Sequence, residues 1–155
     1  MNTTFKIDDK DLAILRILQT NAKATIHEIS QAVHLSATPV HDRIKKLEQH
    51  GVIKQYATLI NAAKVNKSLM VICYVSLKEH NKNAGTKFIN SIMQMPEVIE
   101  CFSISGEFDF MLKVVAENME RYYDFHVNKL SQADNLGHVQ SIFIMGVIKQ
   151  THEIV

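Results

Sequence analysis

Two signals for the start of a helix lie close together near the N-terminus, and they leave room for only one short helix between them. The sequence Thr25-Ile26-His27-Glu28 has the form of a capping box, in which the threonine hydroxyl accepts a backbone hydrogen bond and the glutamate reaches back. Ser36 can cap a further helix, and Pro39 falls in the first turn of that helix, where a missing N–H costs little. The pattern predicts two helices joined by a turn of about four residues.

A supporting helix precedes this pair. Asp8 or Asp9 provides its N-cap, apolar residues follow at positions 12, 14, 15, 17 and 18, and Asn21 closes it. Gly51 ends the third helix after His50. Three helices of which the last two enclose a tight turn are typical of a helix-turn-helix, whose last helix enters the major groove of DNA.

The third helix has one apolar face, formed by Val40, Ile44 and Leu47, which we predict to pack on the other two helices. Asp42 lies opposite and repels phosphate, so it either accepts a hydrogen bond from a cytosine amine or lowers the affinity. An ordinary solvated helix face would carry the same basic residues, and the capped helix pair is what favours DNA as the partner. The predicted DNA-contacting residues are Ser36, Thr38, Pro39, His41, Asp42, Arg43, Lys45 and Lys46.

The charge of the chain gives little further support for a nucleic-acid partner. Its formal net charge is +1, with eight Lys and Arg against six Asp and Glu in residues 1–60. The argument for DNA therefore depends on where the basic residues point. The chain is 46% hydrophobic, yet no apolar run approaches the roughly 18 residues of a membrane helix, and the first residues lack the apolar core of a signal peptide. We expect a cytoplasmic, nucleoid-associated protein.

A second domain follows the helix-turn-helix. Residues 52–60 are rich in β-branched and aromatic side chains and are predicted to form a strand, either a wing or a connecting arm. Residues 61–67 are polar and aperiodic, so we expect them to link a DNA-binding domain of residues 1–60 to a domain of residues 68–155.

The second domain alternates strands and helices. Strands are expected at residues 69–77, 98–104, 108–116 and 139–148, with helical apolar spacing around Phe88 and Tyr122. Gly106 suits the first central position of a two-residue type II′ hairpin. The order βαββαβ indicates a ferredoxin-like fold with two helices on one face of an antiparallel sheet. The whole chain is therefore expected to be α+β.

The other face of this sheet also needs cover. Large apolar residues occupy adjacent positions of the strands, as in Phe110-Met111 and Phe143-Ile144, so both faces are apolar. Two helices cover only one face, and we therefore predict that a second copy of the chain packs on the other.

The sequence gives little indication of an enzyme or a metal site. It contains no HExxH, CxxC, GxSxG or P-loop spacing. Cys73 and Cys101 lie in strand-like runs, which favours buried, reduced thiols over a disulfide or a zinc site. His126 or His138 near Asp109 could in principle carry acid–base chemistry. We expect no catalytic residues, no metal and no cofactor.

Taken together, the chain resembles the Lrp/AsnC family of transcriptional regulators, often called feast/famine proteins. The resemblance runs nearly end to end and is carried by two clusters of residues. The first cluster consists of Asp8, Asp11, Ile14, Leu15, Leu18, Glu28-Ile29, Leu35-Ser36, Val40, Arg43-Ile44, Leu47-Glu48, Gly51-Val52-Ile53 and Tyr56. The second consists of Pro96-Glu97-Val98 and Gly106-Glu107-Phe108-Asp109.

The resemblance implies a C-terminal ligand-sensing domain of the kind called RAM, homodimers that assemble to octamers or discs, and an amino-acid effector in a cleft between dimers. The implied effector residues are Gly106, Glu107, Phe108, Asp109 and Ser141. A glycine permits close backbone approach and a carboxylate can pair with an α-ammonium group. Turn geometry would account for Gly106 equally well, and capping of the hairpin is the stronger explanation for Asp109.

The sequence also departs from the family. Asp134-Asn135 replaces the Pro-Gly that many members carry before the last strand, and Asp42 stands where relatives are often basic. The implied function is sequence-specific, effector-responsive regulation of transcription. The alternatives are an architectural DNA-binding protein without a ligand response and a module whose winged helix binds protein.

Overall fold

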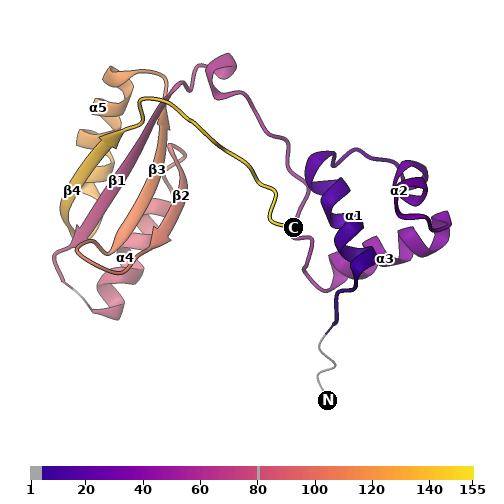
Figure 1. Ribbon diagram of the computed structural model, residues 1–155. Coiled ribbons are helices and arrows are strands. Elements are labelled where there is room, and N and C mark those ends of the chain that lie inside the picture. Colours follow the sequence, from indigo (N-terminus) through magenta and orange to yellow (C-terminus); the bar gives the residue numbers. More distant parts are fainter. Residues whose placement is uncertain (1–4, 80) are drawn as a thin grey trace. The chain divides into compact units, whose positions relative to one another are not determined.

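The computed structural model describes residues 5–79 and 81–155, which divide into two compact units (Figure 1). The first unit runs to Leu59 and also includes Lys149–Val155, and the second covers Ile60–Ile148. Within the described residues, no helix has the length and apolar character needed to cross a membrane.

The helices of the first unit begin where the sequence predicts. The Asp8 carboxylate accepts from the backbone N–H of Asp11 while the Asp11 carboxylate accepts from that of Asp8, and Thr25 and Glu28 form the same reciprocal box. These two capping predictions are confirmed. The three helices are α1 (Asp9–Thr20), α2 (Ile26–Val33) and α3 (Ala37–Gln49).

A small apolar core holds the three helices together. Ile14 of α1, Ile29 and Val33 of α2 and Val40 of α3 are buried against one another, and Leu47 is also buried. His34 ends α2 in the left-handed conformation with φ 53°, which turns the chain into α3. The predicted helix-turn-helix is confirmed, and its second and third helices contact each other directly.

The predicted strand at residues 52–60 is wrong, because this segment forms neither helix nor strand. Leu59 is 71% exposed and Ile60 is 64% exposed. A strand needs a neighbour to pair its backbone N–H and C=O groups, and this segment has no neighbouring strand in the described chain. A short 3-10 helix, η1 (Ala62–Val65), lies within the expected linker.

The second unit is a four-stranded antiparallel sheet with both helices on one face, as predicted (Figure 1). The strand order is β2-β3-β1-β4, so β4 and β2 are the edges. A short 3-10 helix, η2 (Leu130–Gln132), follows the last helix. The other elements are β1 (Leu69–Leu77), α4 (Lys82–Met93), β2 (Val98–Ser103), β3 (Phe110–Ala116), α5 (Met119–Asn128) and β4 (Leu136–Phe143).

Two details differ from the predictions for this sheet. β4 starts and ends earlier than expected, since it pairs with β1 from Leu77 back to Val71, and the backbone N–H of Ile144, just after the strand, donates to the carbonyl of Met70 at 3.0 Å. The hairpin between β2 and β3 is also longer, since the backbone N–H of Ile104 bonds to the carbonyl of Asp109 and leaves four residues in the loop. The predicted two-residue type II′ hairpin is therefore wrong.

The helices cover one face of the sheet, and the other face, which we call the open face, is exposed. Alternate residues of β1 and β3 are buried beneath the helices, where they pack around Phe88 of α4 and Phe125 of α5. The intervening residues face the other way, and so do Phe102 of β2, which is 45% exposed and pairs with Met111, and Ile142 of β4, which is 43% exposed and pairs with Ile72. The open face thus keeps the large apolar side chains that the sequence indicated.

Candidate functional site

Ser36 stands at the N-cap of α3, but its side chain makes no capping hydrogen bond. Its backbone has the usual cap conformation, with φ −76° and ψ 165°. A capping side chain accepts from the N–H of the second or third helical residue, and here the third is Pro39, which has no N–H. The prediction that the Ser36 hydroxyl caps α3 is therefore wrong. The residue lies exposed at the N-terminal end of the helix.

The residues predicted to contact DNA occupy the exposed side of α3, with one exception. Val40 and Leu47, on the opposite side, are fully buried. A carboxylate oxygen of Asp42 lies 3.6 Å from Nδ1 of His41, and an imidazolium there would offset the negative charge of Asp42. The exposed residues are Ser36, Thr38, Pro39, His41, Asp42, Lys45 and Lys46.

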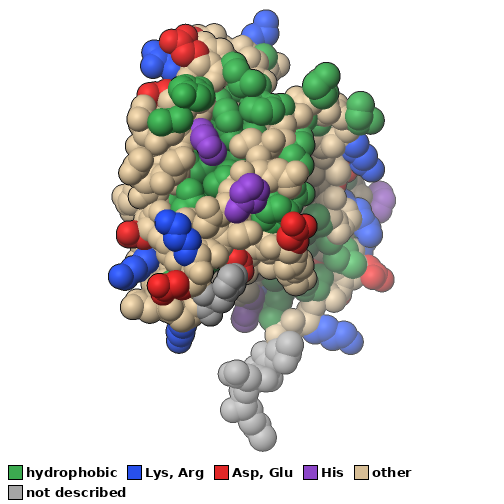
Figure 2. All heavy atoms as spheres, turned by 90° about the vertical axis from the view of Figure 1, so that its left-hand side faces the viewer, with side chains coloured by type: hydrophobic (Ala, Val, Ile, Leu, Met, Phe, Trp, Pro, Cys, Tyr) green, Lys and Arg blue, Asp and Glu red, His purple; other side chains and the backbone are tan. Residues whose placement is uncertain are grey.

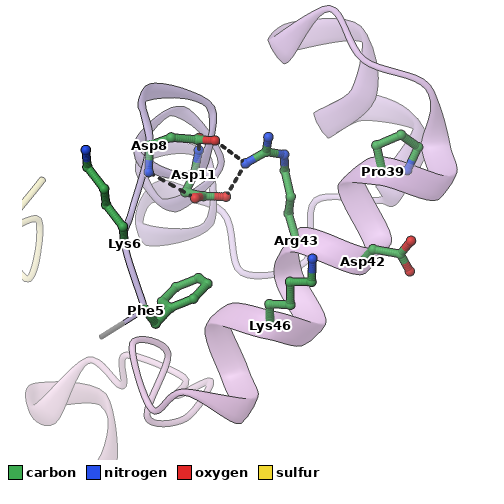
Figure 3. Close-up of a pocket in the computed structure, with 8 residues that line it drawn as sticks. All are labelled: Phe5, Lys6, Asp8, Asp11, Pro39, Asp42, Arg43 and Lys46. Carbon is green, nitrogen blue, oxygen red and sulfur yellow. Dashed lines mark hydrogen bonds and ion pairs between the residues drawn. The ribbon is translucent and has the colours of Figure 1, made fainter. Parts of the chain in front are cut away.

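The exception is Arg43, whose guanidinium joins α3 to the start of α1 (Figure 3). Its Nη1 donates to Oδ2 of Asp8 and to Oδ1 of Asp11, both at 2.7 Å. Asp11 is only 4% exposed, whereas the Arg43 side chain is 30% exposed. The hydrogen bonds from the Asp11 backbone and from Arg43 lower the pKa of the Asp8 carboxyl. We call these three residues the Asp8–Arg43–Asp11 clamp.

A hollow of about 450 Å³ lies beside this clamp (Figure 3). It gathers four of the predicted DNA-contacting residues and leaves the others outside its lining. Phe5 stacks on the His50 ring with 4.3 Å between the centroids. Sequence reasoning missed Phe5 and Lys6, because no periodicity connects them to α3. The lining residues are Phe5, Lys6, Asp8, Asp11, Pro39, Asp42, Arg43 and Lys46.

The segment after α3 is tied to that helix by one side-chain hydrogen bond. The Tyr56 hydroxyl donates to Oε1 of Glu48 at 2.8 Å. Partial burial and the neighbouring carboxylate raise the pKa of Tyr56 to about 12. The tyrosine therefore stays a hydrogen-bond donor at neutral pH and fixes the start of the connecting segment.

The hairpin between β2 and β3 carries four of the predicted effector residues. Gly106 has φ +123°, a conformation that other residues rarely adopt, and it is exposed together with Glu107. The Asp109 carboxylate accepts from the backbone N–H of Leu77 at 2.7 Å and so joins the hairpin to the end of β1. Phe108 lies between Tyr74 and His138, with centroid distances of 5.4 Å and 6.3 Å.

Ser141, the fifth predicted effector residue, is held on the helix side of the sheet. Its hydroxyl is 2.6 Å from the hydroxyl of Tyr122 in α5, which is 3.2 Å from the sulfur of Cys73. Burial raises the pKa of both the Cys73 thiol and the Tyr122 hydroxyl, so both groups stay neutral at neutral pH. Sequence reasoning placed Tyr122 only in the core and missed this contact.

Asn135, a departure from the family pattern, adopts the conformation that a glycine would favour at this position. Its φ is +61°, in the left-handed region that asparagine tolerates better than most residues. Its side chain accepts from the backbone N–H of Glu79 and donates to the carbonyl of Glu79. The loop before β4 is thereby joined to the end of β1.

The described residues contain no group of three or more His, Cys, Asp and Glu side chains placed to hold a metal ion. Cys101 is exposed on the edge strand β2, so the prediction that its thiol is buried is wrong, whereas Cys73 is buried as expected. Both thiols are free. The arrangement offers hydrogen-bond donors and acceptors for binding on both units.

Two family models match the chain, one on each unit. A model described as a winged helix-turn-helix DNA-binding domain matches residues 7–54. A model described as the Lrp/AsnC ligand binding domain matches residues 70–154.

Curated relatives match over almost their whole length. The chain is 35% identical over 150 residues to a leucine-responsive regulatory protein of Rhizobium meliloti, with 96% of each protein covered. It is 34% identical over 146 residues to a glutamate uptake regulatory protein of Zymomonas mobilis, covering 94% of this chain and 88% of that protein.

Solved structures agree with both units. A transcriptional regulator of Neisseria meningitidis in complex with L-Met has a TM-score of 0.92 and 33% sequence identity, with 97% of each chain covered. An AsnC family transcriptional regulator from Agrobacterium tumefaciens has a TM-score of 0.91 and 32% identity, covering 96% of this chain and 97% of that one.

Proposed function

The chain belongs to the Lrp/AsnC family of DNA-binding transcriptional regulators, and we propose that it is a sequence-specific regulator that responds to an amino-acid effector. The observation that carries the DNA-binding part is the surface of α3. One side of this helix is buried in the three-helix core, while the other presents hydroxyl, imidazole and ammonium groups to solvent. These are the groups that contact base edges and phosphates in helix-turn-helix complexes.

The exposed residues divide into two roles in this proposal. Ser36, Thr38 and His41 lie toward the N-terminal end of α3, which enters the major groove, and Lys45 and Lys46 contact phosphates further along. Pro39 and Asp42 belong to the same surface.

Arg43 has a different part in this proposal. Its guanidinium already pairs with Asp8 and Asp11, so we assign it the positioning of α3 on α1 rather than a phosphate contact. The remaining surface is then held at a fixed angle by the clamp, as a recognition helix requires.

We further propose that a second copy of the chain covers the open face of the sheet. Phe102 and Ile142 would be buried there by sheet-on-sheet packing, which is the usual way to hide a second apolar face. Such a dimer presents two recognition helices, and two helices read successive major grooves about 34 Å apart on one side of the duplex. Assembly of dimers to octamers belongs to the same proposal.

The effector would bind beside the hairpin between β2 and β3. Gly106 lets a ligand approach the backbone, and the Asp109 carboxylate would accept from the α-ammonium group of an amino acid. Glu107 and Phe108 complete the proposed site on this hairpin, whereas Ser141 is bonded to Tyr122 on the helix side of the sheet and is left out of it. The L-Met complex of the Neisseria meningitidis relative supports an amino acid as the ligand class.

Thermal unfolding of the full chain in the presence of each of the twenty amino acids tests the effector. A few should raise the midpoint, and at a concentration of 100 times Kd the stabilisation amounts to about 2.7 kcal/mol. The increase should disappear in Asp109→Ala and persist in Glu120→Ala, which removes an exposed carboxylate from α5. An unchanged unfolding midpoint with all twenty amino acids would contradict effector sensing and favour an architectural DNA-binding protein of the same fold.

A further inference from the structure

A second hollow, of about 330 Å³, opens in the sheet unit where α5 and the chain after it pass the start of β4. Taking about 30 Å³ as the volume of one water molecule, it has room for roughly ten non-hydrogen atoms. Figure 2 looks onto the side of the molecule where α5 and β4 lie in Figure 1 and shows histidine side chains at the surface among hydrophobic ones. The lining residues are Lys78, His126, Ser131, Leu136, Gly137, His138 and Val139.

The backbone at this hollow is built around Gly137. Ser76 pairs with His138 and Leu77 with Leu136, so Gly137 is an extra residue on the edge strand. A Cβ on Gly137 would lie 2.8 Å from the carbonyl oxygen of Ser76, closer than real contacts allow. Bulges of this kind redirect side chains and are common next to binding sites. Only glycine fits at this point of the wall.

The other wall is fixed by hydrogen bonds. The backbone N–H of Lys78 donates to the carbonyl of Asn135 at 3.0 Å, and the Asn135 side chain bonds to both backbone groups of Glu79. The Ser131 hydroxyl donates to the carbonyl of His126 at 2.7 Å. The lining side chains are therefore presented by a backbone that is held in place before any ligand arrives.

The ammonium and imidazole side chains of the lining are its donors, since the Ser131 hydroxyl already donates to the carbonyl of His126. Lys78 supplies an ammonium group, and the described lining residues include two imidazoles and one hydroxyl but no carboxylate. Nδ1 of His126 is buried without a hydrogen-bond partner among the described residues. A buried N–H without an acceptor is costly, so the tautomer with Nδ1 unprotonated is favoured and Nε2–H is the donor that the ring offers.

We propose that this hollow binds a small anion whose carboxylate or phosphate oxygens accept hydrogen bonds from Lys78 and His126, while the His138 ring faces Phe108 on the other side of the sheet. Charge-assisted hydrogen bonds from ammonium and imidazole groups are the usual means by which such oxygens are held. The hollow would bind a negatively charged group, whereas the Asp109 carboxylate would bind the positively charged ammonium group of an amino acid. The proposal therefore adds an anion site to the function proposed above and does not depend on it.

Calorimetric titration of the full chain tests the proposal with three probes. Succinate and inorganic phosphate represent the two oxygen sources, and succinamide is an uncharged molecule of nearly the same shape as succinate. At least one of the two anions should bind, and succinamide should not. The anion that binds more tightly shows whether the hollow prefers carboxylate or phosphate oxygens. Absence of binding by both anions at about ten millimolar, the weak end of specific metabolite binding, overturns the proposal.

Two variants assign the binding to this hollow. Lys78→Gln should weaken the anion about tenfold or more, as expected for the loss of one charge-assisted hydrogen bond. Lys82→Gln, which removes the same charge from the start of α4 outside the lining, should leave it within about twofold. If both variants weaken anion binding equally, or if neither weakens it, the assignment to this hollow is overturned.

A measurement on the unmodified chain covers the case in which Lys78→Gln does not fold. Titration with the binding anion should shift the imidazole NMR signals of His126, and unchanged signals overturn the proposal. Asp109→Asn separates this site from the amino-acid site. It should abolish the response to amino acids and keep anion binding, so each proposal can fail while the other stands.

Discussion

Replacement of Arg43 by methionine should destabilise the first unit while preserving most of the packing volume of the side chain. The guanidinium Nη1 donates two hydrogen bonds of 2.7 Å to carboxylates, and one of these belongs to Asp11, which is 4% exposed. Without Arg43 the Asp11 carboxylate stays buried, retaining its bond from the Asp8 backbone but losing its counter-ion. The loss of a hydrogen bond to a charged group costs about 2 kcal/mol.

The expected cost of Arg43→Met lies below the roughly 3–5 kcal/mol for breaking a fully buried ion pair. The Arg43 side chain is 30% exposed, so water can partly replace the lost guanidinium. For a chain of this length, about 2 kcal/mol corresponds to a decrease of roughly 4–8 °C in the unfolding midpoint. Circular dichroism gives the midpoint, and hydrogen exchange should localise the loss of protection to α1 and α3.

Lys46→Met is the matched control, since it removes an exposed cation from the same helix that makes no ion pair with a described carboxylate. Its midpoint should stay within about 1 °C of the parent, the usual range for an exposed surface change. If Arg43→Met behaves like this control, the clamp contributes nothing to the position of α3. The positioning part assigned to Arg43 would then be refuted.

Four further predictions concern charge and packing. Changing Lys45 and Lys46 to alanine together should weaken DNA binding for all sequences and reduce the salt slope by about 3 to 4 for a dimer, as measured by titration at several salt concentrations. Phe102→Glu should shift the sedimentation coefficient of the chain from dimer or larger toward monomer. The folded pKa of Asp8 is lowered, so its ionised carboxylate stabilises the fold above the unfolded pKa near 3.9, and this stabilisation is lost as the pH falls through the folded pKa. Asp8→Asn should therefore destabilise the chain at pH 7, and unfolding curves at successively lower pH should show the difference from the parent shrinking. Gly137→Ala should cost about 1–3 kcal/mol in thermal unfolding, because the new methyl group meets the carbonyl of Ser76.

Local signals in the sequence were sufficient for most of the fold. The N-cap at Asp8 and the capping box at Thr25 were both confirmed, because their partners lie three residues away and are visible in the sequence, while the reciprocal bond from Asp11 to Asp8 was not predicted. The strand at residues 69–77 likewise follows from its apolar run, although the run indicates burial on both faces and the structure buries only alternate residues. The failures came from partners that are distant or absent. The segment of residues 52–60 has the composition of a strand but no neighbour to pair with, and the missing N–H of Pro39 removed the cap expected from Ser36.

The candidate sites were less accessible to sequence reasoning. The exposed face of α3 could be predicted because helical periodicity separates it from Val40 and Leu47. The clamp could not, since Arg43 lies 35 positions after Asp8 and nothing in a single sequence pairs them. The hollow at Gly137 depends on a register shift between two strands, which no periodicity reports. Sequence patterns predict what an element is, and the tertiary contacts decide what its side chains face.

The central claim is that α3 reads DNA, and footprinting of the purified full chain on fragments selected from its own genome tests it most directly. Protected stretches should recur about one helical turn apart on one face of the duplex, and the protection should weaken steadily as salt is raised. A chain that is folded yet protects no fragment at any ionic strength would contradict the claim.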